Sequence, residues 1–279
     1  MTETAVRVSV EWLRLREPAD AAARSHDLVR EVAQGLAGGP AVTVVHDLGC
    51  GSGSMGRWLA PLLDGPQHWV LHDRDRDLLS VAADDPPRAG ADGAAVTVET
   101  RSGDLAGLRP EDLAGASLVT ASALLDLLTA DELEHLVRCC VAAGCPALLT
   151  LSVTGRVELT PGDPLDGVMG AAFNDHQRRS AAGRTLLGGD AVGRAVERFR
   201  SRGAHVSTAE SRWQLDGAEP SLTAEWLHGW VGAACDQRRR LAEAGAAYLA
   251  RRTAELEDGR LGATVHHLDL LARPAGAHR

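Results

Sequence analysis

The sequence of 279 residues contains no lysine, so all 29 of its basic residues are arginine. This bias, together with abundant alanine and glycine, is typical of a GC-rich genome and says nothing about function. The chain also lacks an uninterrupted apolar run of the roughly 20 residues that a transmembrane helix needs. Its N-terminus has no basic stretch followed by an apolar one, as a secretory signal would have. We therefore expect a cytoplasmic protein with no membrane partner.

Cysteine is scarce, and its spacing argues against a metal site. The sequence has no Cys-x-x-Cys pair and no Cys/His spacing typical of zinc. We expect reduced, packed thiols and no bound metal. The five cysteines lie at positions 50, 139, 140, 145 and 235.

Basic residues are fewer than acidic ones, 29 against 38, which gives a formal net charge of −9. An acidic chain repels a phosphate backbone, so we expect no nucleic-acid partner. The arginine clusters at 178–179, 238–240 and 251–252 are interpreted as solvated helix faces.

The most informative segment is rich in glycine and reads Val-Val-His-Asp-Leu-Gly-Cys-Gly-Ser-Gly-Ser over residues 44–54. Short apolar residues run into Asp47, Gly49, Gly51 and Gly53 alternate, and an apolar helical pattern follows. Glycine tolerates positive φ and lets a ligand approach the backbone, and a helix start offers unpaired N–H groups. The segment therefore predicts a buried strand, a tight turn and a helix start that cradle a ligand.

The glycine spacing separates the possible ligands. A dinucleotide-binding turn has the pattern Gly-x-Gly-x-x-Gly, and counted from Gly49 its third glycine is replaced by Ser54. Counted from Gly51, the pattern is met by Gly53 and Gly56, but Gly49 is then unexplained and the strand-end acid comes too early. An NAD(P)-dependent oxidoreductase stays open as an alternative, as does a turn without a ligand. A P-loop is excluded, because no Gly-Lys-Ser/Thr ending follows.

Expected strands and helices alternate along the chain. Helical residues up to Leu36 precede the first strand, and a capping box at Thr129 and Glu132 starts the helix before the fifth strand. This rhythm predicts an α/β fold, a doubly wound, mostly parallel seven-stranded sheet with helical cap insertions. We expect strands at about 42–46, 69–72, 95–100, 117–122, 147–153, 204–209 and 264–272, with a mostly helical stretch at 222–257.

The pattern Asp47-x-Gly49-x-Gly51-x-Gly53 resembles the first motif of class I S-adenosylmethionine-dependent methyltransferases, which have a Rossmann-like fold. The resemblance covers about the first 155 residues well and the rest loosely. It implies S-adenosyl-L-methionine as cofactor and S-adenosyl-L-homocysteine as product.

The resemblance also suggests how the single expected domain is organised. A helical lid segment at 1–40 precedes the cofactor-binding core at 41–155. The remainder at 156–273 carries the helical substrate cap and the last strands, and a tail at 274–279 ends the chain.

The resemblance implies roles for individual residues at the cofactor end. In the family, the glycine turn holds the methionine part of the cofactor, which points to Gly49, Gly51 and Gly53, with Asp47 ordering the turn. An acid at the end of the second strand binds the two ribose hydroxyls in the family, and Asp73 matches it. Two rival acids, Asp75 and Asp77, lie beyond that strand and are expected to start the next helix.

Two further motifs complete the expected cofactor site. An acid after the third strand accepts from the adenine amino group in the family, which points to Asp104, with the Leu105 backbone N–H donating to the ring. A turn aspartate is the alternative for Asp104. The fourth motif at 119–126, which includes Ala121, lines the reacting methyl group in relatives. It lacks the Asn/Asp-Pro-Pro-Tyr/Phe and Pro-Cys motifs of DNA methylation, which favours a small-molecule substrate.

Arginine suits carboxylates because it binds them in a bidentate way. Arg16 or Arg24, in the expected lid, is a candidate for the cofactor carboxylate, and solvated helix charge is the alternative. Trp12 is expected in the core, with stacking on a ligand as the alternative.

The sequence says less about the residues that would bind the methyl acceptor. His176 is the best candidate for a general base or substrate ligand, although a surface role is open, and neighbouring Gln177 and Arg178 are candidate substrate ligands. His46 is expected to be structural. His267 and Asp269 share a strand face and are expected to be satisfied in the core, with an orienting pair as the alternative.

Three tryptophans, Trp213, Trp226 and Trp230, are expected in the core or at an interface, or around an apolar substrate. We expect methyl transfer to oxygen or nitrogen of a small metabolite by a monomer or homodimer. A family member that binds the cofactor without catalysis is a further alternative.

Overall fold

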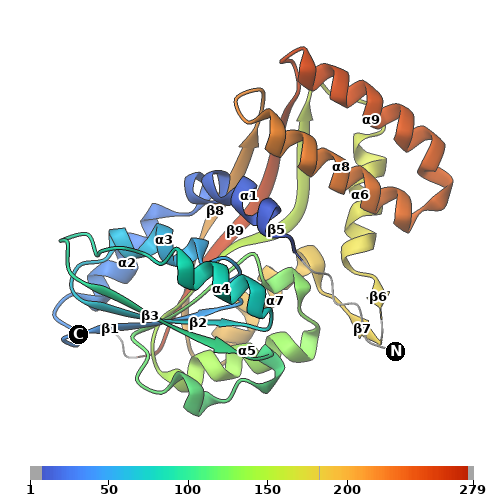
Figure 1. The fold of residues 1–279 in the computed structure, drawn as a ribbon. Coiled ribbons are helices and arrows are strands. Elements are labelled where there is room, and N and C mark those ends of the chain that lie inside the picture. The colour runs from blue at the N-terminus through green and yellow to red at the C-terminus, as the bar shows by residue number, and fades with distance from the viewer. Residues whose placement is uncertain (1–7, 182, 276–279) are drawn as a thin grey trace.

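The computed structural model describes residues 8–181 and 183–275, which build one seven-stranded sheet with the order β3-β2-β1-β4-β5-β9-β8 (Figure 1). The first five strands of that order run parallel, and β9 lies antiparallel between β5 and β8. This topology confirms the predicted doubly wound, mostly parallel sheet. The strands are β1 (Thr43–Leu48), β2 (Gln67–Asp73), β3 (Val96–Ser102), β4 (Leu118–Ser122), β5 (Ala147–Thr160), β8 (His205–Leu215) and β9 (Gly262–Arg273).

Helices cover both faces of the sheet. On one face lie α2 (His26–Leu36), α3 (Ser54–Leu59) and α4 (Arg76–Asp84), and on the other α5 (Ala130–Ala143) and α7 (Ala191–Ser201). Successive side chains of a strand point to opposite faces, so Leu148 packs into the core of the first group and Leu149 into that of the second. The predicted capping box is confirmed, because Thr129 and Glu132 cap α5 reciprocally.

Three strands continue beyond the edge of the sheet where β1, β2 and β4 end. The last residue of β4, Ser122, pairs with Thr150, yet β5 runs on to Thr160, and β8 and β9 accompany it. A helical cap of α6 (Asp166–Gln177), α8 (Pro220–Gln237) and α9 (Ala242–Glu257) packs on these extensions (Figure 1). Strand β5 is thus longer than the sequence predicted, and the cap lies over the carboxyl edge of the sheet.

The expected N-terminal helical stretch is divided into two helices. The first helix, α1 (Val10–Ala23), ends at Arg24, and Ser25 caps α2 by accepting from the backbone N–H of Leu28. Ala19 of α1 belongs to the cap core, and Glu17 forms a bidentate ion pair with Arg57 of α3. Thus α1 is attached both to the cap and to the sheet.

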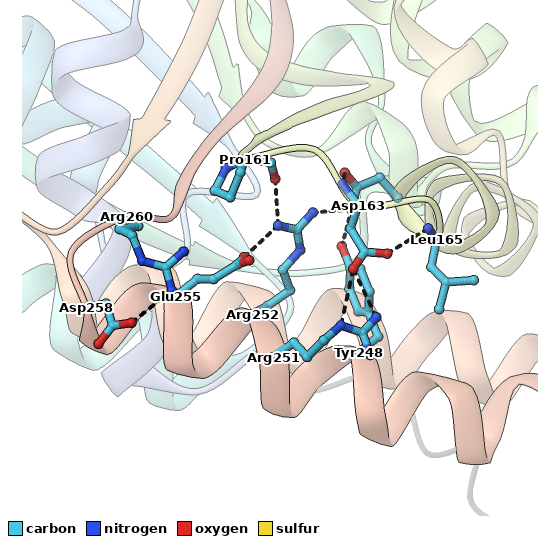
Figure 2. Close-up of polar contacts among 10 residues, drawn as sticks. Pro161, Asp163, Leu165, Tyr248, Arg251, Arg252, Glu255, Asp258 and Arg260 are labelled. Carbon is cyan, nitrogen blue, oxygen red and sulfur yellow. Dashed lines mark hydrogen bonds and ion pairs between the residues drawn. The ribbon is translucent and has the colours of Figure 1, made fainter.

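A buried arginine joins the parts of the cap (Figure 2). Arg252 of α9 is 1% exposed and donates to the carbonyl of Pro161 and to the carboxylates of Asp166 and Glu255. Tyr248, one turn earlier in α9, donates to the same oxygen of Asp166 at 2.6 Å. These bonds fix the N-terminus of α6 to α9.

A small two-stranded ribbon, β6 (Ser180–Ala181) and β7 (Arg184–Thr185), follows α6. Within the described ranges, no helix combines the length and apolarity required to cross a bilayer.

Candidate functional site

The glycine turn after β1 has the tight, left-handed geometry that its glycines allow. Gly49, Gly51 and Gly53 have φ values of 66°, 55° and 87°, in the left-handed region that favours glycine. A Cβ at Gly51 would lie 3.3 Å from a methyl carbon of Leu13, and one at Gly49 would lie 3.0 Å from Leu124. The turn leads directly into α3, for which Gly53 is the N-cap. Its backbone is therefore closely covered by α1 and by the segment after β4.

A cavity of about 1300 Å³ opens at this edge of the sheet, between the glycine turn, α1 and the cap. Ligand pockets for drug-sized molecules have volumes of about 300–1,000 Å³, so the space exceeds the need of one ligand. Of the predicted site residues, Asp47, Gly49, Gly51, Asp73, Asp104 and Leu105 border the cavity. The other four, Gly53, Ala121, Arg24 and His176, do not border it.

Asp73 lies at the end of β2 and holds the glycine turn. Its Oδ2 accepts from the backbone N–H of Gly51 at 2.9 Å, and its Oδ1 accepts from that of Asp75 at the same distance. A carboxylate offers about four lone-pair sites, so two acceptor sites remain for a ligand. Asp75 caps α4, as expected from the sequence, and thus does not compete for this role.

Asp47 is fully buried beneath the turn. Its Oδ1 accepts from the hydroxyl of Thr120 at 2.8 Å, whereas its Oδ2 has no hydrogen-bond partner. Burial raises the pKa of this carboxyl to about 7, and the Asp73 charge adds to the rise, while Thr120 and Arg24 oppose it. A cation bound beside Oδ2 would favour the ionised form.

Arg24 is 2% exposed and lies behind two serines of the cavity wall. Its Nη2 donates to the hydroxyls of Ser54 and Ser122, and its guanidinium lies 5.2 Å from the ring centre of Trp58. Its Nε and Nη1 are buried without a hydrogen-bond partner. Burial lowers the pKa of Arg24, and the nearest carboxylate, that of Asp20, only reaches 4.0 Å. An anion would therefore find unused donors here.

Arg16, the other candidate for a carboxylate ligand, is already engaged. Its Nε and Nη2 both donate to Asp20, and its guanidinium lies 4.9 Å from the ring centre of Trp213. Asp20 in turn accepts from the indole N–H of Trp213. This cluster fixes α1 to β8.

The segment after β3 places its acid at the rim of the cavity. Asp104 is exposed, and its Oδ1 caps a short 3₁₀ turn by accepting from the backbone N–H of Ala106 at 2.8 Å. Its other oxygen has no hydrogen bond within the described parts of the chain. At the end of β4, Ala121 is buried, and its neighbours Ser122 and Ala123 reach the cavity. Ala123 has φ 51°, which a non-glycine residue rarely adopts.

Asp126 is a wall residue to which the sequence analysis gave no role. It lies in the 3₁₀ turn Leu125–Leu127 after β4 and makes no side-chain hydrogen bond to another described residue. Burial raises its pKa to about 6, and Arg16 opposes the rise. Its place in the wall follows from the fold, so the only signal in the sequence was that Asp126 is the last residue of the fourth motif.

The candidate base His176 lies on α6, one residue before a wall residue, Gln177. Burial lowers its pKa, and Arg179 adds to the effect. His46, expected to be structural, is buried, and its Nδ1 lies 3.0 Å from Nε2 of His72.

His267 and Asp269 have separate surroundings. Asp269 accepts from the backbone N–H groups of Ser25 and Leu151 and from the hydroxyl of Ser211, so protein donors satisfy it in the core. His267 borders the cavity, and its ring centre lies 5.4 Å from that of Trp213.

The far part of the cavity is lined by aromatic side chains from four elements. Trp12 and Trp213 meet edge to face at 6.3 Å between ring centres, and Trp226 and Trp230 stack at 5.6 Å. Phe173 lies 6.4 Å from Trp230. The sequence grouped Trp213, Trp226 and Trp230, but not Trp12 and Phe173, which lie far from them in the chain.

No cluster of His, Cys, Asp or Glu that could hold a metal ion occurs within residues 8–181 and 183–275.

No protein-family model matches the sequence, and no curated protein matches it either. Among solved structures, the chain is similar to the cyclopropane synthase MmaA2 from Mycobacterium tuberculosis, with a TM-score of 0.48 and 14% identity over 95% of both chains. It is also similar to an S-adenosylmethionine-dependent methyltransferase from Thiobacillus denitrificans in complex with S-adenosyl-L-homocysteine, with a TM-score of 0.45 and 17% identity over 95% of this chain and 99% of that one.

A methyltransferase from Geobacter sulfurreducens, also in complex with S-adenosyl-L-homocysteine, has a TM-score of 0.41 and 18% identity over 94% of this chain and 98% of that one. Because all three identities lie below 25% and all three TM-scores below 0.5, these likenesses do not decide the activity. The case for an activity rests on the cavity and its residues.

Proposed function

We propose that this chain is a methyltransferase that uses S-adenosylmethionine to methylate an oxygen or nitrogen atom of a small molecule. One observation carries the proposal. A left-handed glycine turn and a strand-end carboxylate border one large cavity, and buried arginine donors without partners lie directly behind two serines of its wall. Each of the three suits a different part of the same cofactor.

The ribose would be held by Asp73. Its two free acceptor sites suit a vicinal diol, and hydrogen bonds to a carboxylate are the stronger kind. Adenine would lie toward Asp104 and Leu105 at the rim, where one oxygen of Asp104 is free to accept from the exocyclic amino group.

The amino-acid part would lie at the other end, over Gly49 and Gly51. Its carboxylate suits the unused Nε and Nη1 donors of Arg24. Its ammonium and the sulfonium are cations, and Asp47 has a buried oxygen without a partner beneath the same turn. The carboxylate of the cofactor would thus find unpaired donors on Arg24, and its cationic groups would find an unpaired oxygen on Asp47.

When bound, S-adenosylmethionine supplies a methyl group on a sulfonium, which a nucleophile takes by in-line displacement. The chain itself aligns the acceptor and excludes water, which can supply several kcal/mol. A hydroxyl or ammonium acceptor also needs a site for its proton. Asp126 is better placed than His176 for this, because its carboxyl borders the cavity and its pKa of about 6 is near neutrality.

A dinucleotide fits the turn less well. In dinucleotide-binding folds the first glycine makes the tight turn after the first strand, and the residue directly after β1 is Gly49. Counted from there, Ser54 stands where the third glycine is needed.

The test is calorimetric titration of the protein with S-adenosylmethionine, S-adenosylhomocysteine and NADH. We expect both sulfur nucleosides to bind, and Asp73→Asn to weaken that binding roughly 10- to 100-fold, because two charge-assisted hydrogen bonds become neutral ones. Asp64→Asn, at an exposed site away from the cavity, is the matched control and leaves the affinity unchanged. Tight NADH binding without nucleoside binding would refute the proposal.

A further inference from the structure

The aromatic part of the cavity indicates which acceptor it takes. The chain has only nine aromatic residues, six tryptophans, two phenylalanines and one tyrosine. Five of these nine border the cavity, and none of the five lies at the cofactor turn. They are Trp12, Phe173, Trp213, Trp226 and Trp230. Scarce residues are thus concentrated at one site, where Trp213, Trp226 and Trp230 also belong to the core of the cap.

The five rings come from elements that surround the space. Trp12 lies on α1, Phe173 on α6, Trp213 on β8, and Trp226 and Trp230 on α8. Aliphatic wall residues such as Val153, Val157 and Val265 complete the lining at β5 and β9. A flat ring system that enters between these walls can make stacked and edge-to-face contacts, which a flexible chain cannot.

Besides Nδ1 of His267, two polar atoms in this part of the cavity lack partners. Trp230 is 2% exposed, and its indole N–H is buried without an acceptor. The Oε1 of Gln177 is also buried without a donor. A buried polar group without a partner is costly, and a ligand with both an acceptor and a donor atom would satisfy these two.

Three arginines of the wall away from the glycine turn are neutralised by carboxylates. Arg16 is paired with Asp20, Arg184 with Glu132, and Arg156 with Glu158, while Arg179 donates to the carbonyl of His176. The wall therefore offers little to a highly charged acceptor and more to a neutral one.

We infer that the acceptor is a flat, neutral ring system with at least one hydrogen-bonding substituent, held among these five aromatic side chains. This inference rests on the proposed function for its methyl-transfer step, although the binding of such a ring does not depend on it. The space supports both ligands at once, because the cavity exceeds the volume of a pocket for one drug-sized molecule.

The experiment compares 2-naphthol and 8-hydroxyquinoline with 1-decanol, a flexible alcohol of similar carbon number. Each is titrated into the full-length protein saturated with S-adenosylhomocysteine, and binding is followed by calorimetry. We expect the two ring compounds to bind at least tenfold more tightly than the alkanol. Equal or tighter binding of 1-decanol, or no binding of either ring compound at millimolar concentration, would overturn the inference.

Two variants locate the binding. Phe173→Leu and Trp230→Leu are expected to weaken 2-naphthol binding roughly five- to tenfold, because a ring contact is lost, and to leave the affinity for S-adenosylhomocysteine unchanged. Phe173 is only half-buried, so its variant is expected to fold even where Trp230→Leu does not. Phe199→Leu removes a ring from the core on the opposite face of the sheet and serves as control.

The two hypotheses fail in different ways. Naphthol affinity that is unchanged in both folded cavity variants overturns the ring-binding site while nucleoside binding stands. Absence of nucleoside binding to the wild type overturns the proposed function, and the same titrations on the protein without nucleoside then test the ring-binding site alone.

Discussion

Two buried side chains at the cofactor end, Arg24 and Asp47, each retain polar atoms that the protein does not satisfy. Both are nearly inaccessible. Asp47 borders the cavity beneath the glycine turn, and Arg24 bonds to the wall residues Ser54 and Ser122. Unpaired buried polar groups lower stability. A charged ligand at the cavity would bond to these atoms and remove that cost.

A truncated ligand separates the role of Arg24 from that of Asp73. We expect Arg24→Met to weaken binding of S-adenosylhomocysteine by roughly 10- to 100-fold, since a charge-assisted pair with the carboxylate is lost. Binding of 5′-methylthioadenosine, which lacks the amino-acid part, is expected to stay unchanged in this variant and to fall in Asp73→Asn. Calorimetry with both ligands makes the comparison, and an equal loss for both in Arg24→Met would contradict the assignment.

Asp47 is expected to make stability depend on pH. Burial raises its pKa from 3.8 to about 7, so between these values the folded protein holds a proton that the unfolded chain releases. The stabilisation is therefore complete below about pH 4 and is lost as the pH rises through 7. Asp47→Asn removes this loss.

The melting temperature of Asp47→Asn relative to wild type is thus expected to rise by roughly 5 °C between pH 5 and pH 8 in the ligand-free protein. Thermal denaturation at both pH values measures it. Thr120→Val, which removes the hydroxyl donor to Asp47, is expected to enlarge the pH dependence. A pH-independent difference between Asp47→Asn and wild type would show that the carboxyl does not titrate as described.

At the scale of elements, local sequence signals predicted the strands and helices that build the cofactor end of the sheet. A glycine turn, a capping box and apolar strands depend on neighbouring residues, which is why β1, β2, β4 and α5 were foreseen. The extension of β5 to Thr160 was not, because its exposed face is polar after Val153 and its pairing partner β9 lies over 100 residues away. Helix α6 was foreseen only as part of a helical cap region, without bounds, since its apolar residues do not form a clear stripe.

The attachment of α6 to α9 depends on one buried arginine (Figure 2). Arg252→Met leaves Asp166 and the Pro161 carbonyl without their cation, and we expect a loss of about 2–3 kcal/mol in the free energy of unfolding. Arg251→Met is the matched control, because that side chain is 50% exposed and its pair with Asp163 is worth under about 1 kcal/mol. Urea denaturation compares them, and equal losses would contradict the role of Arg252.

At the scale of the whole molecule, the sheet and the cap share three strands. The chain passes from sheet to cap along β5 and β8 and returns along β9 without a linker (Figure 1). In addition, α1 is bonded to α3 through Glu17 and to β8 through Asp20. A cavity between parts joined in this way is expected to keep its shape without ligand.

We therefore expect sheet and cap to unfold together. Hydrogen exchange in increasing urea is expected to give the same free energy of opening for residues 262–266, in the cap part of β9, and for residues 268–272, in the sheet part. Saturating S-adenosylhomocysteine should raise both values equally. Earlier opening of the cap part alone would show that the cap is an independent unit.

The sequence by itself determined the doubly wound fold, the glycine turn and the acid at the end of β2, because each depends on residues close together in the chain. Only the tertiary structure decided that Arg24 and Asp47 keep unpaired polar atoms, that Asp126 is a wall residue and that five scarce aromatic residues meet at one cavity. Those facts depend on burial and on contacts between α1, α6, α8 and β8, which are distant in the chain and are brought together by the long strands. The class of ligand expected at the turn could thus be predicted from local pattern, whereas the acceptor chemistry depends on packing.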